Sequence, residues 1–153
     1  MVSSNSHIQA LLFDFVGVLL LQRNDYVPDE MVDAVDALAG QVVDDHQFTE
    51  TVLNDYRLPE PMFYYILTKI VDKYTPFHPL WNLLPELRRR YKLAIINNGT
   101  SLTLPLFNAK FGINDKFDAF VSSAVEGTRK PDTQIYLRAC ERLRVPPERC
   151  LFA

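Results

Sequence analysis

Short, largely apolar runs occur at four places along the chain, and each of the first three ends in polar or glycine residues. They cover Ile8 to Phe15, Leu93 to Ile96, Phe117 to Ser122, and a fourth run that begins at Cys150. A short run with apolar residues on both faces is typical of a strand buried in the middle of a parallel sheet. The pattern therefore predicts four buried strands.

A different period fills the chain between the first two of these strands. Apolar side chains recur there every three or four residues, most regularly from Phe63 to Tyr74, as in an amphipathic helix. Asp29 is placed to cap a first helix that stops at Gly40. We expect an insertion of nearly pure helix in this part of the chain. Further helices are predicted over residues 42–56, 80–90, 103–112 and 132–144.

Strands and helices alternate in the second half of the chain, which predicts an α/β fold with a parallel sheet. The chain has 153 residues, the size of one domain, and 48% of them are hydrophobic, enough for a substantial core. Sixteen Lys and Arg against nineteen Asp and Glu give a net charge of −3. Because there is no basic surplus, nucleic-acid binding is not expected.

The sequence carries no sign of export or of membrane insertion. Residues 1–9 lack a positively charged leader. The apolar stretch Leu11 to Leu21 is interrupted by a carboxylate and a glycine, and it is shorter than the ~20 residues of a membrane span. Cys140 and Cys150 have no metal-binding spacing, and we expect two free, buried thiols in a reducing compartment. These features predict a cytoplasmic protein.

Polar residues whose side chains could act in catalysis or binding follow three of the predicted strands. Asp14 ends the first strand, Asn97-Asn98-Gly99 ends the second, and Lys130 lies in the loop after the third. In open α/β sheets the carboxyl ends of the strands form the ligand site, so these residues could converge on one anion. Each also has a simpler interpretation, because Asp14 could cap the strand, Asn-Asn-Gly is an ordinary turn, and a lone lysine is usually on the surface.

The motifs at these strand ends resemble those of the haloacid dehalogenase-like (HAD) hydrolase superfamily, in its helical-cap subclass. The resemblance lies in the segments Leu11 to Leu19, Leu93 to Thr100, Gly127 to Asp132 and Val145 to Ala153, and it covers residues 8–153. It implies a three-layer, Rossmann-like parallel sheet. Residues 1–18 and 81–153 would form this core, C-terminally incomplete because the chain stops before the acidic residues of the fourth motif. Residues 19–80 would form a small helical cap.

The resemblance also implies roles for individual residues. Asp14 would be the nucleophile and Lys130 its cationic partner. Asp14 and the backbone carbonyl of Val16 would bind Mg²⁺. The substrate would be bound by three consecutive residues of the second motif, Asn97, Asn98 and Gly99.

The activity implied by this resemblance is that of a phosphatase acting on a small phosphorylated metabolite. Val16 stands where phosphatases of the family carry an acid, which would impair the reaction. One alternative is a metal-independent hydrolase of the 2-haloacid dehalogenase type, and another is a non-catalytic binding or scaffold protein. The expected partner is a small-molecule substrate rather than nucleic acid or a membrane, and a homodimer is left open.

Overall fold

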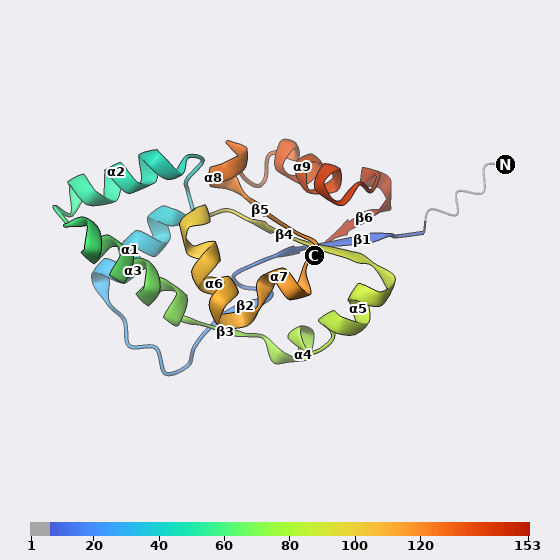
Figure 1. Cartoon of the computed structure of the whole chain (residues 1–153), viewed down its shortest axis with the longest axis horizontal. Coiled ribbons are helices and arrows are strands. Elements are labelled where there is room, and N and C mark those ends of the chain that lie inside the picture. The colour runs from blue at the N-terminus through green and yellow to red at the C-terminus, as the bar shows by residue number, and fades with distance from the viewer. Residues whose placement is uncertain (1–6) are drawn as a thin grey trace.

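The computed structural model describes residues 7–153, so the first six residues of the predicted core segment lie outside it. Within these residues a parallel sheet contains β1 (Ala10–Asp14), β4 (Lys92–Asn97), β5 (Ala119–Ser122) and β6 (Cys150–Phe152). The strand order is β5-β4-β1-β6, so β1 pairs with both β4 and β6 (Figure 1). All four predicted strands are therefore confirmed.

Helices cover both faces of this sheet, which makes a three-layer, Rossmann-like arrangement (Figure 1). Phe13 and Ile95 pack on the face covered by α5 (Leu84–Arg90), α6 (Leu104–Phe111) and α7 (Ile113–Lys116). Leu12 and Ile96 point to the other face, against α9 (Thr133–Leu143). The apolar side chains of β1 and β4 are largely buried on both faces, because successive side chains alternate between two apolar layers, whereas Leu151 and Phe152 of β6 are exposed.

The long helices of the insertion lie beyond the carboxyl ends of the strands (Figure 1). Asp29 accepts hydrogen bonds from two backbone N–H groups of the first helix, and Gly40 ends that helix, as predicted. No helix within residues 7–153 has the length and apolar character needed to span a bilayer. The helices of residues 20–83 are α1 (Glu30–Ala39), α2 (Asp45–Asp55), α3 (Glu60–Asp72) and α4 (His78–Trp81).

The expectation of a nearly pure helical insertion was wrong in one respect. The two ends of the insertion pair as an antiparallel ribbon of β2 (Leu20–Gln22) and β3 (Tyr74–Pro76). Both segments are too short for their period to be read from the sequence, and each forms by pairing with a segment that is distant in the sequence. The predicted helix over residues 80–90 is also divided, because α4 ends at Trp81 and α5 begins at Leu84.

The remaining short elements complete the second half of the chain. The helix α8 (Ser123–Glu126) follows β5, and 3-10 turns span Ser101–Thr103 and Pro147–Arg149.

Cys140 is buried and Cys150 is half-buried, and both thiols are free, as expected, although burial is complete only for the first. Burial, and then the neighbouring Cys140 thiol, raise the pKa of Cys150 to about 12, so the thiol stays protonated near neutral pH.

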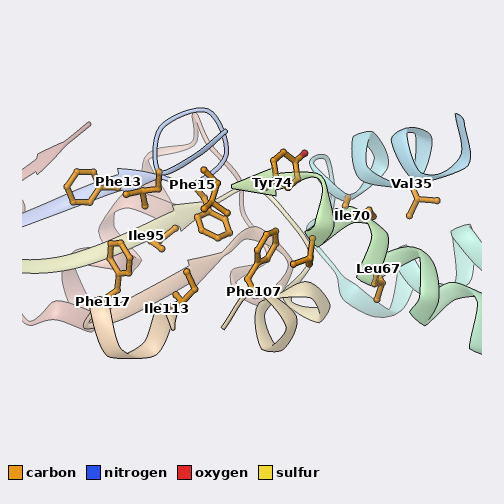
Figure 2. Close-up of a cluster of buried hydrophobic side chains, with 14 of the residues drawn as sticks. Phe13, Phe15, Val35, Leu67, Ile70, Tyr74, Ile95, Phe107, Ile113 and Phe117 are labelled. Atoms are coloured by element: carbon orange, nitrogen blue, oxygen red, sulfur yellow. The ribbon is translucent and has the colours of Figure 1, made fainter. Parts of the chain in front are cut away.

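One apolar cluster joins the sheet to the inserted helices. Figure 2 shows its side chains running from Phe13 on the sheet, through Phe107 of α6, to Val35 of α1. The Phe107 ring lies 5.0 Å from that of Phe15 and 6.3 Å from that of Tyr74, measured between centroids. Because Phe107 contacts both the sheet and the ribbon, it holds the two parts of the chain together.

Replacing this aromatic ring should therefore be costly. We expect Phe107→Ala to lower the free energy of unfolding by about 3–5 kcal/mol, because a large cavity forms in a fully packed cluster. Phe77→Ala is the matched control, since that ring is 39% exposed and should lose much less. Urea denaturation of both variants measures the difference, and equal losses would contradict the central role of Phe107.

Candidate active site at the carboxyl ends of the strands

The ends of β1 and β4 bring the predicted site residues to one edge of the sheet. Asp14 is the last residue of β1 and is in register with Ile96 of β4. Asn97 therefore lies one residue beyond the end of the paired segment. After Asp14 the chain turns through Gly17, whose φ of +96° is a conformation that residues with a Cβ rarely adopt. The turn leaves the carboxylate of Asp14 at the end of the strand instead of in the apolar layers.

The closest charged contact at this edge joins Asp14 to Lys130. The Lys130 Nζ lies 2.6 Å from Asp14 Oδ1, and the backbone N–H of Phe15 donates to the same oxygen at 2.8 Å. Asp14 Oδ2 receives no hydrogen bond from residues 7–153. The side chain of Asp14 is 38% exposed, whereas that of Lys130 is only 14% exposed. One carboxylate oxygen is thus fixed in place and the other is free to contact a ligand.

Lys130 is held at both its backbone and its ammonium group. Asn98 Oδ1 accepts from the Lys130 N–H at 2.7 Å, and Asn98 Nδ2 donates to the Lys130 carbonyl at 3.1 Å. The ammonium also donates to the Ile96 carbonyl at 2.8 Å. Since an ammonium has three donors, one N–H remains for an anion after the contacts with Asp14 and Ile96.

The loop of residues 97–99 is organised by its own close contacts. A Cβ on Gly99 would lie 2.6 Å from Asn97 Nδ2, so the Asn97 amide rests directly on the glycine. The Gly99 N–H donates to Ser123 Oγ at 2.9 Å, and Ser122 Oγ donates to the Gly99 carbonyl at 2.6 Å. The structure thus brings the three predicted substrate residues beside Asp14 and Lys130. Their contact with a substrate stays a prediction, and Asn98 and Gly99 already have partners within the protein.

A cavity of about 320 Å³ opens between this loop and the inserted helices. Its wall includes Val16 and residues 97–100 from the core, and Asp36 and Lys73 from the insertion. Asp14 and Lys130 lie beside this wall and are not part of it. A larger groove of about 650 Å³ is lined by α1, α3 and the loop of residues 23–29, but no residue from the carboxyl ends of the parallel strands lines it. We therefore assign the smaller cavity to the site.

The inserted wall of the cavity contains a compact ionic network. The Lys73 ammonium, whose side chain is 7% exposed, lies 2.8 Å from both Asp33 Oδ1 and Asp36 Oδ2. The hydroxyls of Tyr26 and Tyr74 donate to Asp33 and Asp36 respectively. Burial alone would lower the pKa of Lys73, but the two carboxylates outweigh it and raise the pKa. Hydrogen bonds from Lys73 and then Tyr26 lower the pKa of Asp33.

Sequence reasoning missed a second set of polar contacts at the site. Asp45 of α2 accepts hydrogen bonds from Thr100 and Ser101, and Ser123 Oγ donates to the Val42 carbonyl at 2.6 Å. The polar pair Ser122-Ser123 at the end of a predicted strand was a usable signal for part of this set. Nothing in the sequence around Asp45 indicates a partner more than fifty residues away.

The predicted Mg²⁺ site can be tested against the donors present. Asp14 and the Val16 carbonyl offer oxygen, the ligand type that Mg²⁺ prefers. Over residues 7–153, however, no group of three or more Asp, Glu, His or Cys side chains is placed to hold a metal. Mg²⁺ requires near-octahedral coordination. The donors of the described residues therefore do not complete a magnesium site by themselves.

Comparison with known proteins identifies a family and a fold. The model of a hydrolase family described as haloacid dehalogenase-like hydrolase matches residues 8–153. No curated protein matches the chain.

Solved structures with the same fold include both phosphatases and dehalogenases. A HAD family enzyme from Bacteroides thetaiotaomicron, in complex with magnesium and inorganic phosphate, has a TM-score of 0.67 at 16% identity, over 95% of this chain and 83% of that one. The L-2-haloacid dehalogenase PA0810 has a TM-score of 0.63 at 20% identity, over 95% and 75%. A HAD phosphatase from Thermococcus onnurineus has a TM-score of 0.67 at 21% identity, over 95% of this chain and 76% of that one. Likenesses at this level of identity establish the fold.

The contact between Gly99 and Asn97 leads to a first test of the site. Gly99→Ala should displace the Asn97 amide, because the new Cβ would overlap it, while the flexible end of that side chain can move aside. We expect a stability loss of about 1 kcal/mol or less but a clear loss of affinity for inorganic phosphate. Calorimetric titration and urea denaturation measure the two effects. Gly127→Ala, at a glycine with open space around it and φ +70°, controls for a purely local backbone effect.

The ionic network leads to a second test, on stability. Lys73→Met should lower the free energy of unfolding by about 1–3 kcal/mol near pH 7, because two carboxylates lose their buried donor. Lys69→Met, at an exposed position of α3, the helix that Lys73 caps, is the matched control and should stay within about 0.5 kcal/mol. Urea denaturation measures both.

The same network gives the effect a pH dependence. Because the folded pKa of Asp33 is lowered, its stabilisation is complete above the unfolded value of about 3.9 and is lost as pH falls through the folded value. The difference between wild type and Lys73→Met should therefore hold from about pH 7 to about pH 4 and narrow over the range below about pH 4. A difference that stays constant over this range would show that Lys73 does not act through Asp33.

Proposed function

Since the chain belongs to the haloacid dehalogenase-like hydrolase family, we propose that it hydrolyses a phosphate monoester of a small metabolite, with Asp14 as the nucleophile. The observation that supports this most directly is the 2.6 Å contact between Lys130 Nζ and Asp14 Oδ1. A carboxylate held by a cation at the end of a strand can attack an anionic substrate without meeting unscreened repulsion.

The free oxygen of Asp14 defines the first chemical step. Oδ2 attacks the phosphorus, the bond from phosphorus to the ester oxygen breaks, and the leaving group departs with the electron pair. Water then attacks the phosphorus of the aspartyl phosphate, which releases inorganic phosphate and restores the carboxylate. The sum is one ester and one water converted to one alcohol and one phosphate.

Lys130 has two tasks in this proposal. Its contact with Oδ1 holds the carboxylate in place and leaves Oδ2 available for the attack. Its remaining N–H can bind a phosphoryl oxygen, where negative charge must be neutralised during transfer. Asn98 is better described as a positioning residue for Lys130, because its amide is engaged with the Lys130 backbone.

The residue at position 16 limits which leaving groups can be expelled. Val16 has no ionisable group, and its side chain lies exposed beside Asp14. A general acid commonly contributes about 10²–10⁴ in rate, so an alkoxide without one leaves slowly. Substrates with acidic leaving groups, which need no proton, should therefore be favoured.

The size of the substrate follows from the cavity. We propose that residues 19–80 act as a cap over the strand ends and that the leaving group occupies the space of about 320 Å³ between cap and core. A volume of this size suits a metabolite of modest size.

A second candidate function is supported by the same departures from a phosphatase site. Attack of Asp14 on a carbon bearing a halogen requires neither a proton donor nor a metal, because halide leaves as a stable anion. Val16, which has no proton to donate, favours this 2-haloacid dehalogenase type of reaction. Lys130 would pair there with the substrate carboxylate.

Water labelled with heavy oxygen distinguishes the two reactions. Water attacks phosphorus in the first, so the label enters inorganic phosphate. In the second it attacks the carbonyl carbon of the Asp14 ester, so the label enters Asp14 itself and mass spectrometry of the peptide detects it. Single-turnover reactions with p-nitrophenyl phosphate and with a 2-haloacid are the two assays. Absence of turnover in both would support the non-catalytic alternative.

The proposed function predicts how turnover depends on Asp14 and on the leaving group of the substrate. Turnover should be abolished by Asp14→Asn and unchanged by Asp55→Asn, which makes the same substitution at the exposed end of α2. p-Nitrophenyl phosphate should be cleaved at least about 10²-fold faster than a simple alkyl phosphate, because Val16 supplies no proton. Equal rates for the two esters would mean that another residue acts as the acid.

A further inference from the structure

The N-terminus of α2 is fastened to the loop that follows β4. Asp45 Oδ1 accepts hydrogen bonds from Thr100 Oγ1 at 2.5 Å and from the Ser101 N–H at 3.0 Å. Asp45 Oδ2 accepts from the Ser101 hydroxyl. Three donors of one short loop therefore converge on a single carboxylate of the insertion.

A neighbouring contact fastens the same segment of the insertion a second time. Ser123 Oγ, which is fully buried, donates to the Val42 carbonyl at 2.6 Å and accepts from the Gly99 N–H at 2.9 Å. The loop of residues 99–101 is thus connected at both of its ends to residues 42–45.

These contacts are not required for the helix to form. Asp44 is the N-cap of α2, and its own carboxylate accepts from the Gln47 N–H at 2.7 Å. The Asp45 carboxylate takes no part in capping. It accepts hydrogen bonds from Thr100 and Ser101 of the core instead. Asp45 therefore has a role between the two parts of the chain that its position in the helix does not explain.

The fastened loop leads directly to the catalytic pair. Asn98 precedes the segment 99–101, and its amide forms two hydrogen bonds with the Lys130 backbone. Lys130 in turn contacts Asp14. We propose that Asp45 is a positioning residue: by fixing residues 99–101 it fixes Asn98, and through Asn98 it holds Lys130 against Asp14 when α2 is docked. This inference rests on the proposed function for its chemical consequence but not for the coupling itself.

Amide exchange measured by NMR on the full chain tests the coupling without any turnover. In Asp45→Ala, the amides of Ser101 and Lys130 should exchange about 10-fold faster, because the hydrogen bonds that protect them weaken. The amides inside α2 should be unchanged. Asp45→Asn, which keeps one acceptor oxygen, should restore part of the protection, and Asp55→Asn should have no effect.

Binding of inorganic phosphate, measured by calorimetry, tests the chemical consequence. Its dissociation constant should rise about 5- to 10-fold in Asp45→Ala and less in Asp45→Asn. If wild type binds no phosphate but exchange at Lys130 responds as expected, the coupling stands and the proposed function fails. Unchanged exchange at Lys130 in Asp45→Ala would overturn the proposal, and so would a uniform increase across the whole chain, which would show only general destabilisation.

Discussion

The ion pair between Lys130 and Asp14 sets the geometry of the site, and the structure around it supplies the contacts that this pair needs. The Lys130 ammonium is largely enclosed, and a cation in such a place needs a counter-charge and satisfied donors. Asp14 supplies the charge and Ile96 supplies a carbonyl, so the ends of β1 and β4 must meet at one level. The parallel register of these two strands, fixed by apolar side chains on both faces, is what brings them there.

The pair also explains why amides and hydroxyls, with few further charges, surround it. Asn98, Ser122 and Ser123 satisfy backbone groups near Lys130 and Gly99 without adding charge. Further carboxylates close to Asp14 would compete with it for the single ammonium. The acidic groups Asp33 and Asp36 of the insertion instead share a cation of their own, Lys73, so they do not draw on the Lys130 ammonium.

The sequence made the sheet and the pair predictable, because both depend on local signals. Apolar runs gave the strands, and the rule that ligands bind at strand ends singled out Asp14 and Lys130. The roles of Asn98 and Asp45 could not be found in this way, because each depends on a hydrogen-bond partner at least thirty residues distant. The ribbon of β2 and β3 escaped prediction for a related reason, since three-residue strands carry no period of their own.

Two of the contacts between the insertion and the core differ in how easily they can be broken. At the ribbon, the rings of Phe15, Phe107 and Tyr74 pack in an apolar cluster, and separating them exposes large surfaces to water. At α2, the contacts of Asp45 are hydrogen bonds that water can replace, at a net cost of about 0.5–1.5 kcal/mol each. Opening of the cavity should therefore begin at α2 and pivot about the ribbon, so the end that moves is the end fastened to the loop beside Lys130.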